Sequence, residues 1–374
     1  MAGVSITPLA NRRERRLFVD LPFRLHAGTP WIPPLKIERH LFLSRRLNPF
    51  FKHGEAELFL ARRDGRVVGR VSAQIDHAFN EFHGNRWGMF GFLELEDDPE
   101  AMDALLEAAG SWLRERGCDR MVGPMDLTVN DESGILIEGQ ELEPMIRQPW
   151  HPDYYQRLCE GAGLEKAMDL YSWELEIENR GTTLLPVLEE LDVKAREEHG
   201  VTIRKMSRRR LRRELDDFAE IYNAAWAENW GFVPLSKADL DTYAIDLQLV
   251  YRPEWFMVAE KDGETIAIAI TVIDLNQVLK RMKGRLLPFG WLQFLRRNRI
   301  CDRVRVGFLG VKPEHQHTGV AAALYMAHFD AAAVSRQKRG EAGWILETNE
   351  AMNRGLEAMG GSIVKRYRLY ERLL

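Results

Sequence analysis

The chain has 374 residues, 45% of them hydrophobic, so we expect two domains, each with a core of its own. Its formal net charge of −4 excludes a protein that binds nucleic acid through bulk positive charge. The three scattered cysteines, Cys118, Cys159 and Cys301, have no metal-binding spacing, which predicts no metal site and a reducing compartment.

The ends and apolar runs of the chain indicate a cytoplasmic location. The first residues carry arginines but no apolar stretch after them, so we expect no secretory signal. The longest clean apolar run, residues 266–273, is far too short to cross a bilayer.

The first half begins with an arm and continues with strands. Residues 1–55 are rich in proline, arginine and aromatic residues and predict an irregular arm or a pair of short helices. Residues 57–62, the turn Asp64-Gly65 and residues 67–75 predict an antiparallel hairpin. A third strand is expected over 87–95, followed by a helix that Asp98 caps and Pro99 begins.

The second half repeats this order. We expect a strand over 201–205 and a helix over 211–227, and then a hairpin formed by residues 255–260 and 265–274. A strand over 304–311, a helix over 319–334, a strand over 343–347, a helix over 351–359 and a last strand over 363–371 follow. The repeat predicts an α/β (α+β mixed-sheet) fold with two tandem domains, 56–185 and 200–374. One continuous mixed sheet is the alternative.

Residues 276–300, here called the basic insertion, have no place in the repeat. They include seven lysines and arginines, no acidic residue, and several leucines and aromatic residues. Such a segment can lie at a lipid headgroup surface or form the wall of an acyl-chain tunnel. The alternative is a helical excursion that packs on its own domain.

A loop at residues 314–319 precedes an alanine-rich helix and carries the strongest chemical signal. Unpaired backbone N–H groups and the helix dipole at this point can bind a phosphate or pyrophosphate. Gly319 and Ala321 are small, which we expect to let an anion approach the backbone. No Gly-Lys-Ser/Thr follows, so the loop is not a Walker A motif.

The segment Gln316-His317-Thr318-Gly319-Val320-Ala321, preceded by Leu309-Gly310-Val311-Lys312-Pro313, resembles the pyrophosphate loop of the GNAT acyltransferase superfamily. The resemblance implies an N-acyltransferase with acyl-CoA as co-substrate and no metal. It implies that Leu309, Gly310 and Val311 pair with the pantetheine arm, and that the N–H groups of 316–321 hold the pyrophosphate.

Further roles are implied by the same resemblance. Asn349 or Asn353 would contact CoA, although Asn349 also suits a helix N-cap. Tyr367 and Tyr370 are candidates to protonate the leaving thiolate, the alternative being half-buried aromatic residues of a strand. Glu347 is the candidate general base. Glu260, His315 and a water molecule are the alternatives.

The first half lacks such a loop, because residues 95–104 contain no glycine and are strongly acidic. They would repel a pyrophosphate, so we expect a degenerate GNAT-like domain. Polar loops at 123–134 and 149–155 are where an acceptor would bind, with Asn130, Glu132, His151 and Tyr154 as candidates. Ordinary turn chemistry is the alternative.

Over its whole length the chain resembles a bacterial group of tandem GNAT proteins that includes the bacterial ceramide synthases. Trp31-Ile32-Pro33-Pro34-Leu35 and Asn48-Pro49-Phe50-Phe51 add to this resemblance. It implies a primary amine acceptor, such as a sphingoid-like lipid. The composition of 276–300 adds an expected peripheral contact with the inner membrane face. A non-catalytic acyl-CoA sensor and a Fem-like aminoacyl transferase are the alternatives.

The basic run 204–213 is followed by acidic residues, so we expect a solvated helix face and no nucleic-acid partner.

Overall fold

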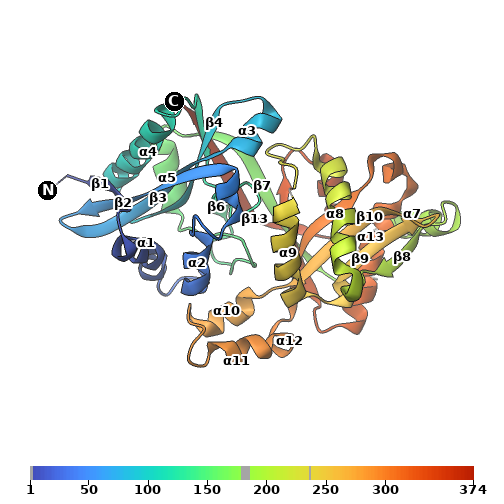
Figure 1. Cartoon of the computed structure of the whole chain (residues 1–374). Helices are drawn as coiled ribbons and strands as arrows, with labels where there is room; N and C mark the ends of the chain where they lie inside the picture. Colours follow the sequence, from blue (N-terminus) through green and yellow to red (C-terminus); the bar gives the residue numbers. More distant parts are fainter. Residues whose placement is uncertain (1–2, 178–185, 236) are drawn as a thin grey trace. The chain divides into compact units, whose positions relative to one another are not determined.

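The computed structural model describes residues 3–177, 186–235 and 237–374. The chain forms two compact units, neither of which is a continuous stretch of sequence (Figure 1). Unit 1 comprises Met1–Leu170, Asn276–Arg296 and Lys365–Leu374, and unit 2 comprises Tyr171–Leu275 and Arg297–Val364. Strands β7 (Glu165–Glu176) and β13 (Ser362–Leu373) contribute residues to both units.

Unit 1 contains a mixed sheet with the strand order β1-β2-β3-β4-β5-β13, and β6 pairs with β13. The pairs from β1 to β4 are antiparallel, β4 and β5 are parallel, and β5 is antiparallel to β13. Asp64 and Gly65 both adopt positive φ, as a two-residue hairpin turn requires, which confirms the predicted hairpin. The strands are β1 (Ser5–Pro8), β2 (Gly54–Arg63), β3 (Arg66–Asp76), β4 (Trp87–Leu95), β5 (Arg120–Gly123) and β6 (Ile135–Glu138).

Three helices of unit 1, α1, α3 and α4, begin at a polar side chain that accepts hydrogen bonds from the first turn. Asp98 Oδ1 accepts a hydrogen bond from Ala101 N at 3.2 Å, and Pro99 occupies the first turn of α4, as predicted. Asn11 caps α1 in the same way, so the predicted arm contains a strand and a 14-residue helix. The helices are α1 (Arg12–Leu25), α2 (Lys36–Phe42), α3 (His77–His83), α4 (Pro99–Arg114) and α5 (Tyr154–Gly161), with the short 3-10 helix η1 (Pro49–Lys52).

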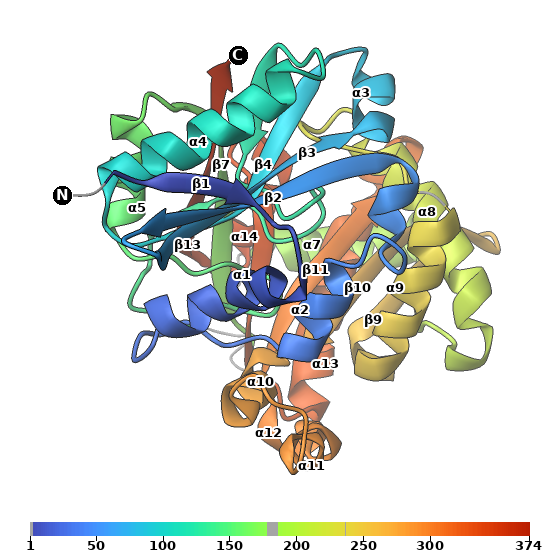
Figure 2. The ribbon, with the colours of Figure 1, turned by 60° about the vertical axis from the view of Figure 1, so that its left-hand side comes forward.

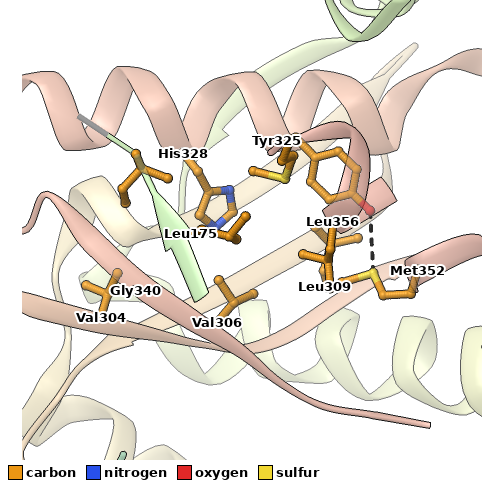
Figure 3. Close-up of a pocket in the computed structure, with 11 residues that line it drawn as sticks. Leu175, Val304, Val306, Leu309, Tyr325, His328, Gly340, Met352 and Leu356 are labelled. Atoms are coloured by element: carbon orange, nitrogen blue, oxygen red, sulfur yellow. Dashed lines mark hydrogen bonds between the residues drawn. The ribbon is translucent and has the colours of Figure 1, made fainter. Parts of the chain in front are cut away.

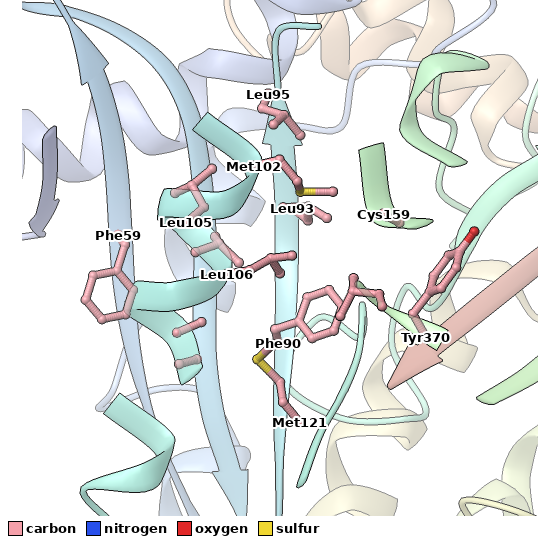
Figure 4. Close-up of a cluster of buried hydrophobic side chains, with 14 of the residues drawn as sticks. Phe59, Phe90, Leu93, Leu95, Met102, Leu105, Leu106, Met121, Cys159 and Tyr370 are labelled. Atoms are coloured by element: carbon pink, nitrogen blue, oxygen red, sulfur yellow. The ribbon is translucent and has the colours of Figure 1, made fainter. Parts of the chain in front are cut away.

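Two apolar cores lie on opposite faces of this sheet. Helix α4 buries Leu105 and Leu106 against residues such as Phe59 and Phe90, in the cluster that Figure 4 shows. On the other face, Phe18 of α1 packs with Phe92 and other buried residues. Figure 2 shows α4 and α1 on the two sides of strands β1 to β3. Each fully buried Leu or Phe stabilises the unit by about 1.5–3 kcal/mol.

The strands of unit 2 pair in the order β8-β9-β10-β11-β12-β7. Its pattern matches that of unit 1, because three antiparallel pairs are followed by a parallel pair, β11 and β12, joined through a helix. The predicted repeat in element order is therefore present. The strands are β8 (Thr202–Lys205), β9 (Phe256–Lys261), β10 (Glu264–Ile273), β11 (Arg303–Val311) and β12 (Arg339–Leu346).

The helices of unit 2 cover both faces of its sheet. Tyr222 and Phe218 of α8 pack on Phe308 of β11, and α13 packs against α7 and strands β9 and β10. Helix α7 lies between the two expected domains, 56–185 and 200–374, and residues 178–185 before it lie outside the described residues. The helices are α7 (Pro186–Glu197), α8 (Leu211–Trp226), α9 (Lys237–Val250), α12 (Arg297–Ile300), α13 (Val320–Val334) and α14 (Glu350–Ala358), with 3-10 helices η2 (Arg208–Arg210), η3 (Pro253–Trp255) and η4 (Pro313–Thr318).

The basic insertion contains helices α10 (Asn276–Met282) and α11 (Gly290–Leu295), which belong to unit 1. Asn276 Nδ2 donates to Pro144 O at 2.8 Å, and Lys36 N donates to Gly284 O at 3.2 Å. Residues 276–296 thus belong to unit 1, with whose N-terminal segments they make these anchoring contacts, whereas residues 297–300 belong to unit 2, the domain that the insertion interrupts.

None of the helices in the described ranges is both long and apolar enough to cross a bilayer.

Candidate functional site

The parallel strands of unit 2 separate part-way along their length. Their last paired residues are Val306 and Ala342, yet β11 continues to Val311, paired only with β10. A bulge at Gly307 marks the point of separation, since Ile270 faces Phe308 and the next residue, Thr271, faces Val306. Residues 307–311 and 343–346 thus border an opening, here called the unit 2 wedge.

The wedge exposes the edge of a strand to a ligand. An extended chain with amide groups can pair with such an edge as an added strand. The predicted pantetheine-pairing residues Leu309, Gly310 and Val311 all lie on this part of β11.

Strand β11 leads directly into the predicted pyrophosphate loop. Residues 313–318 form η4, Gly319 follows with φ +79°, and α13 begins at Val320. No side chain caps the first turn of α13, so its N–H groups and the positive end of the helix dipole face the loop. The predicted residues Gln316, His317, Thr318, Gly319, Val320 and Ala321 come together here.

Gly319 is small for a different reason from the one that we expected. Its φ of +79° favours glycine, and a Cβ at this position would lie 2.5 Å from the carbonyl oxygen of Leu191 in α7. The Cα of Gly319 therefore faces helix α7. The close packing of two helices is by itself sufficient to account for this glycine.

Lys312, at the start of the loop, is engaged by carboxylates. Its Nζ lies 2.7 Å from Glu220 Oε1 and 2.7 Å from Glu264 Oε1. The backbone of α13, not this lysine, is consequently the electropositive group that remains for a phosphate.

The two candidate asparagines hold the far side of the wedge. Asn349 caps α14 through a 3.1 Å bond from Met352 N, which matches the alternative considered for it. Asn353 Oδ1 accepts from Trp173 Nε1 at 3.0 Å, and its Nδ2 donates to Leu346 O at 3.1 Å. These contacts fix the end of β12, and any contact with CoA stays a prediction.

The candidate bases differ in their surroundings. Glu347 directly follows β12, beside the wedge, and is partly exposed. Glu260 lies on β9 and is bound by Arg204 Nε at 2.7 Å. His315 lies within η4. Of the three, Glu347 borders the wedge itself.

Tyr367 and Tyr370 belong to unit 1 and are buried in it. Tyr370 is 1% exposed, pairs with Gly123 of β5 and is part of the core beneath α4. Its hydroxyl finds no hydrogen-bond partner among the described residues, and burial raises its pKa. Tyr367 is fully buried and donates to Gln148 Oε1 at 3.5 Å. Both are aromatic residues of a strand, as in the alternative, but they are fully buried where that alternative expected half-buried side chains.

The four acceptor candidates also lie in unit 1, in internal hydrogen bonds. His151 is 5% exposed, and its Nδ1 accepts from Leu136 N at 3.1 Å. Burial lowers the pKa of His151 to about 4. Tyr154 donates to Leu95 O at 2.8 Å, Glu132 lies 3.4 Å from Arg39 Nη1, and Asn130 N donates to Thr128 Oγ1 at 3.2 Å.

The comparisons with known proteins concern the fold and the family of the chain. The structure resembles a tandem GNAT protein from the clavulanic acid biosynthesis pathway, with a TM-score of 0.57 and 12% identity over 99% of this chain and 98% of that one. It also resembles a GCN5-related N-acetyltransferase from Sphaerobacter thermophilus, with a TM-score of 0.53 and 12% identity over 99% and 95%. At such low identity the likeness concerns the fold alone.

Sequence relatives are closer, although no family model matches the chain. The chain is 36% identical to the bacterial ceramide synthase of Caulobacter vibrioides, over 100% of this chain and 98% of that protein. This chain belongs to the tandem GNAT group that includes the bacterial ceramide synthase. This chain is also 34% identical to protein YghO of Escherichia coli, over 97% of this chain and 93% of that protein.

The first GNAT-like unit of this tandem GNAT protein has its own wedge, which its own chain fills. Strands β4 and β5 pair up to Met89 and Val122, and beyond them Met125 N donates to Phe90 O at 2.8 Å. Asp126 Oδ1 accepts from Phe92 N at 2.7 Å. The segment after β5 therefore occupies the gap that stays open in unit 2, which adds a steric reason to the acidic one for expecting no CoA site in this unit.

A buried polar network in unit 1 was not predicted from the sequence. Glu94 Oε2 lies 2.7 Å from His26 Nε2 and accepts from the Tyr155 hydroxyl at 2.9 Å. Burial alone would raise the pKa of Glu94, but attraction to His26 and Arg70 lowers it to about 2. His26 and Glu94 are distant in sequence and carry no motif, so only the fold reveals the pair.

Among the described residues, no group of three or more His, Cys, Asp or Glu side chains is arranged to hold a metal ion.

Proposed function

We propose that this tandem GNAT protein is an N-acyltransferase that transfers an acyl group from acyl-CoA to a primary amine. The observation that carries the proposal is the continuity of two features in unit 2. The open edge of β11 leads through the single 3-10 helix η4 to the uncapped N-terminus of α13. An amide-containing arm with a pyrophosphate at its end matches both features at once.

The reaction requires few groups from the protein. The amine, after losing a proton, attacks the thioester carbonyl carbon, so that a C–N bond forms and the C–S bond breaks. The CoA thiolate then takes up a proton. Glu347, at the end of β12, is our candidate to accept the proton of the amine, directly or through water. The buried positions of Tyr367 and Tyr370 in unit 1 favour solvent as the source of the proton for the thiolate.

Binding of the donor can be measured by calorimetry with free CoA and palmitoyl-CoA. We choose Ala321→Glu, because an acidic side chain in the first turn of α13 favours the helix dipole and yet repels a pyrophosphate. We expect folding to be retained and the affinity for both ligands to fall at least roughly tenfold.

The matched control is Ala333→Glu, the same substitution on an exposed position near the other end of α13. It should bind both ligands as the wild type does. Equal affinity of wild type and Ala321→Glu would contradict the pyrophosphate site, and no binding by the wild type would overturn the acyl-CoA proposal.

For the acceptor we infer a long-chain, sphingoid-like lipid amine. The C. vibrioides relative is named a bacterial ceramide synthase, and this name supports a role in lipid metabolism. Turnover of palmitoyl-CoA with sphinganine, compared with a short-chain amine, tests the inference. Glu347→Gln should lose turnover while it keeps its affinity for CoA, whereas an acyl-CoA sensor has no turnover to lose.

We also propose that the protein is cytoplasmic and contacts the inner membrane face through the basic insertion. Around α11, Leu287 is 73% exposed, Phe289 71% and Leu295 62%, beside basic residues such as Lys283 and Arg285. Apolar side chains with a basic collar suit an anionic lipid surface.

Co-sedimentation with phosphatidylcholine vesicles, with and without phosphatidylglycerol, tests this contact. We expect binding to the anionic vesicles and its loss in the double variant Leu287→Ser/Phe289→Ser. Leu249→Ser, at an exposed leucine of unit 2, is the control. Unchanged binding of the double variant would assign the contact to another surface.

A further inference from the structure

We propose that an apolar pocket within unit 2 receives the acyl chain of the donor and sets the chain length that the enzyme accepts. This inference rests on the proposed function, because it concerns the same donor. The pocket lies between β11 on one side and helices α13 and α14 on the other (Figure 3).

The pocket begins at the unit 2 wedge. Leu309 lines it and lies beyond Val306, the last residue of β11 that pairs with β12. Figure 3 shows Leu309, Met352 and Tyr325 together at one end, and Val304 with Gly340 at the other. Its wall therefore follows about 16 Å of β11 away from the wedge, at roughly 3.3 Å for each residue. A chain bound in the wedge can thus continue into the pocket.

The lining offers no polar group that needs water. His328 is the lining residue best able to bind a water molecule, but both of its ring nitrogens are already engaged. Its Nδ1 donates to Leu324 O at 2.7 Å, and its Nε2 accepts from the Thr271 hydroxyl at 2.8 Å. Burial lowers the pKa of His328, so the ring stays neutral. The Tyr325 hydroxyl contacts Met352 Sδ at 3.4 Å. An apolar cavity of this kind stays dry and binds apolar ligands.

The pocket is small at rest but is lined by adaptable side chains. Its cavity volume is about 20 Å³, so a long chain enters only if the lining moves. Helix α14 contributes Met352 and Leu356, and its C-cap contributes Met359. Methionine side chains repack readily. At the far end, a Cβ on Gly340 would lie 2.6 Å from Val304 O, so this end cannot take a larger residue. We therefore expect a graded preference for chain length.

The test compares Kd values for free CoA, acetyl-CoA, octanoyl-CoA and palmitoyl-CoA. Each methylene buried in the pocket should tighten binding about fourfold, until the pocket is full. In Met352→Trp, the indole fills the end next to the wedge. We expect the affinity for palmitoyl-CoA to fall at least roughly tenfold, with free CoA and acetyl-CoA unchanged.

The control Glu357→Trp adds the same side chain at an exposed position of α14 and should behave as the wild type. Met359→Ala enlarges the pocket and should shift the preference toward longer chains, a gain that loss of folding cannot produce. Equal affinity of the wild type for acetyl-CoA and palmitoyl-CoA, or an unchanged chain-length profile in both pocket variants, would overturn the pocket. Failure to bind free CoA would instead overturn the proposed function.

Discussion

Gly319 illustrates how one residue can meet a structural demand inside a candidate binding loop. Its positive φ and the nearby Leu191 carbonyl are properties of the fold, and they operate whether or not a ligand is bound. A substitution chosen to disturb the ligand would therefore disturb the packing of α7 on α13 first. For this reason the test of the loop uses Ala321.

We predict that Gly319→Ala lowers the free energy of unfolding by roughly 2–4 kcal/mol, since the positive φ costs about 1 kcal/mol and the overpacking a further 1–3. Gly200→Ala is the control, because Gly200 also has a positive φ of +66° but nothing within 4 Å of its Cβ position. It should lose only the smaller amount. Urea denaturation measures both, and equal losses would show that Leu191 yields.

His151 is buried and neutral, which links stability to pH. Its pKa is about 4 in the folded chain and about 6.5 when unfolded. Between these values the unfolded chain holds the extra proton, so stability from this group is complete above pH 6.5 and falls as the pH drops toward 4. The difference amounts to up to about 3 kcal/mol.

Asp131 acts in the opposite direction, because burial raises its pKa to about 6. The wild-type slope alone is therefore not diagnostic. We predict that the stability difference between wild type and His151→Gln, measured by urea denaturation, shrinks as the pH falls from 6.5 to 4. A difference that does not change with pH would contradict a neutral, buried His151.

At the scale of elements, each unit has a parallel strand pair that separates part-way along its length, and only the gap in unit 1 is filled by the chain. In unit 1 the wedge is filled by the chain itself, and a Cβ on Gly91 would lie 1.9 Å from Met125 O. In unit 2 the nearest atom to a Cβ on Gly307 is Ile270 O, at 3.7 Å. Glycine is thus obligatory in the first wedge and optional in the second.

We predict that Gly91→Ala lowers the melting temperature sharply, whereas Gly307→Ala changes the free energy of unfolding by less than about 1 kcal/mol. Differential scanning calorimetry of both variants measures the contrast. Similar losses would mean that the gap beside β11 is as tightly filled as the gap beside β4.

Local signals were sufficient to predict most elements. Asp64-Gly65 set the first hairpin through backbone conformation, and Asp98 set the start of α4 through a single hydrogen bond. The predicted pyrophosphate loop could be recognised because the residues of its motif are contiguous in the sequence. Local signals could not predict which core would bury each element. Tyr370 is an example, because its strand pattern does not reveal that the strand packs into unit 1. The Glu94–His26 pair and α9 carried no local signal that we recognised.

At the scale of the whole molecule, the two units interleave along the chain. Unit 2 includes the second half of β7 and Ile177 after it, whose N donates to Lys338 O at 3.0 Å. It also includes α7, which packs on α13. The linear division at residue 200 removes both. We therefore expect the chain segment 200–374 to fold poorly by itself.

We predict that residues 200–374 expressed alone give no cooperative thermal transition, because α13 loses its cover by Leu188 and Ala195 of α7. Residues 171–374, which restore these elements, should recover part of the transition as measured by circular dichroism. Cooperative melting of the shorter segment would contradict the assignment of α7 to unit 2.

The place of Tyr370 in the core of unit 1 has a consequence for synthesis on the ribosome. Strand β13 pairs with β5 and β6 of unit 1, yet residues 365–374 are translated after all of unit 2. Unit 1 is thus begun first but completed last, and the apolar surface that β13 covers stays exposed while unit 2 is synthesised. Nascent chains of this kind are the ones that chaperones shield from aggregation.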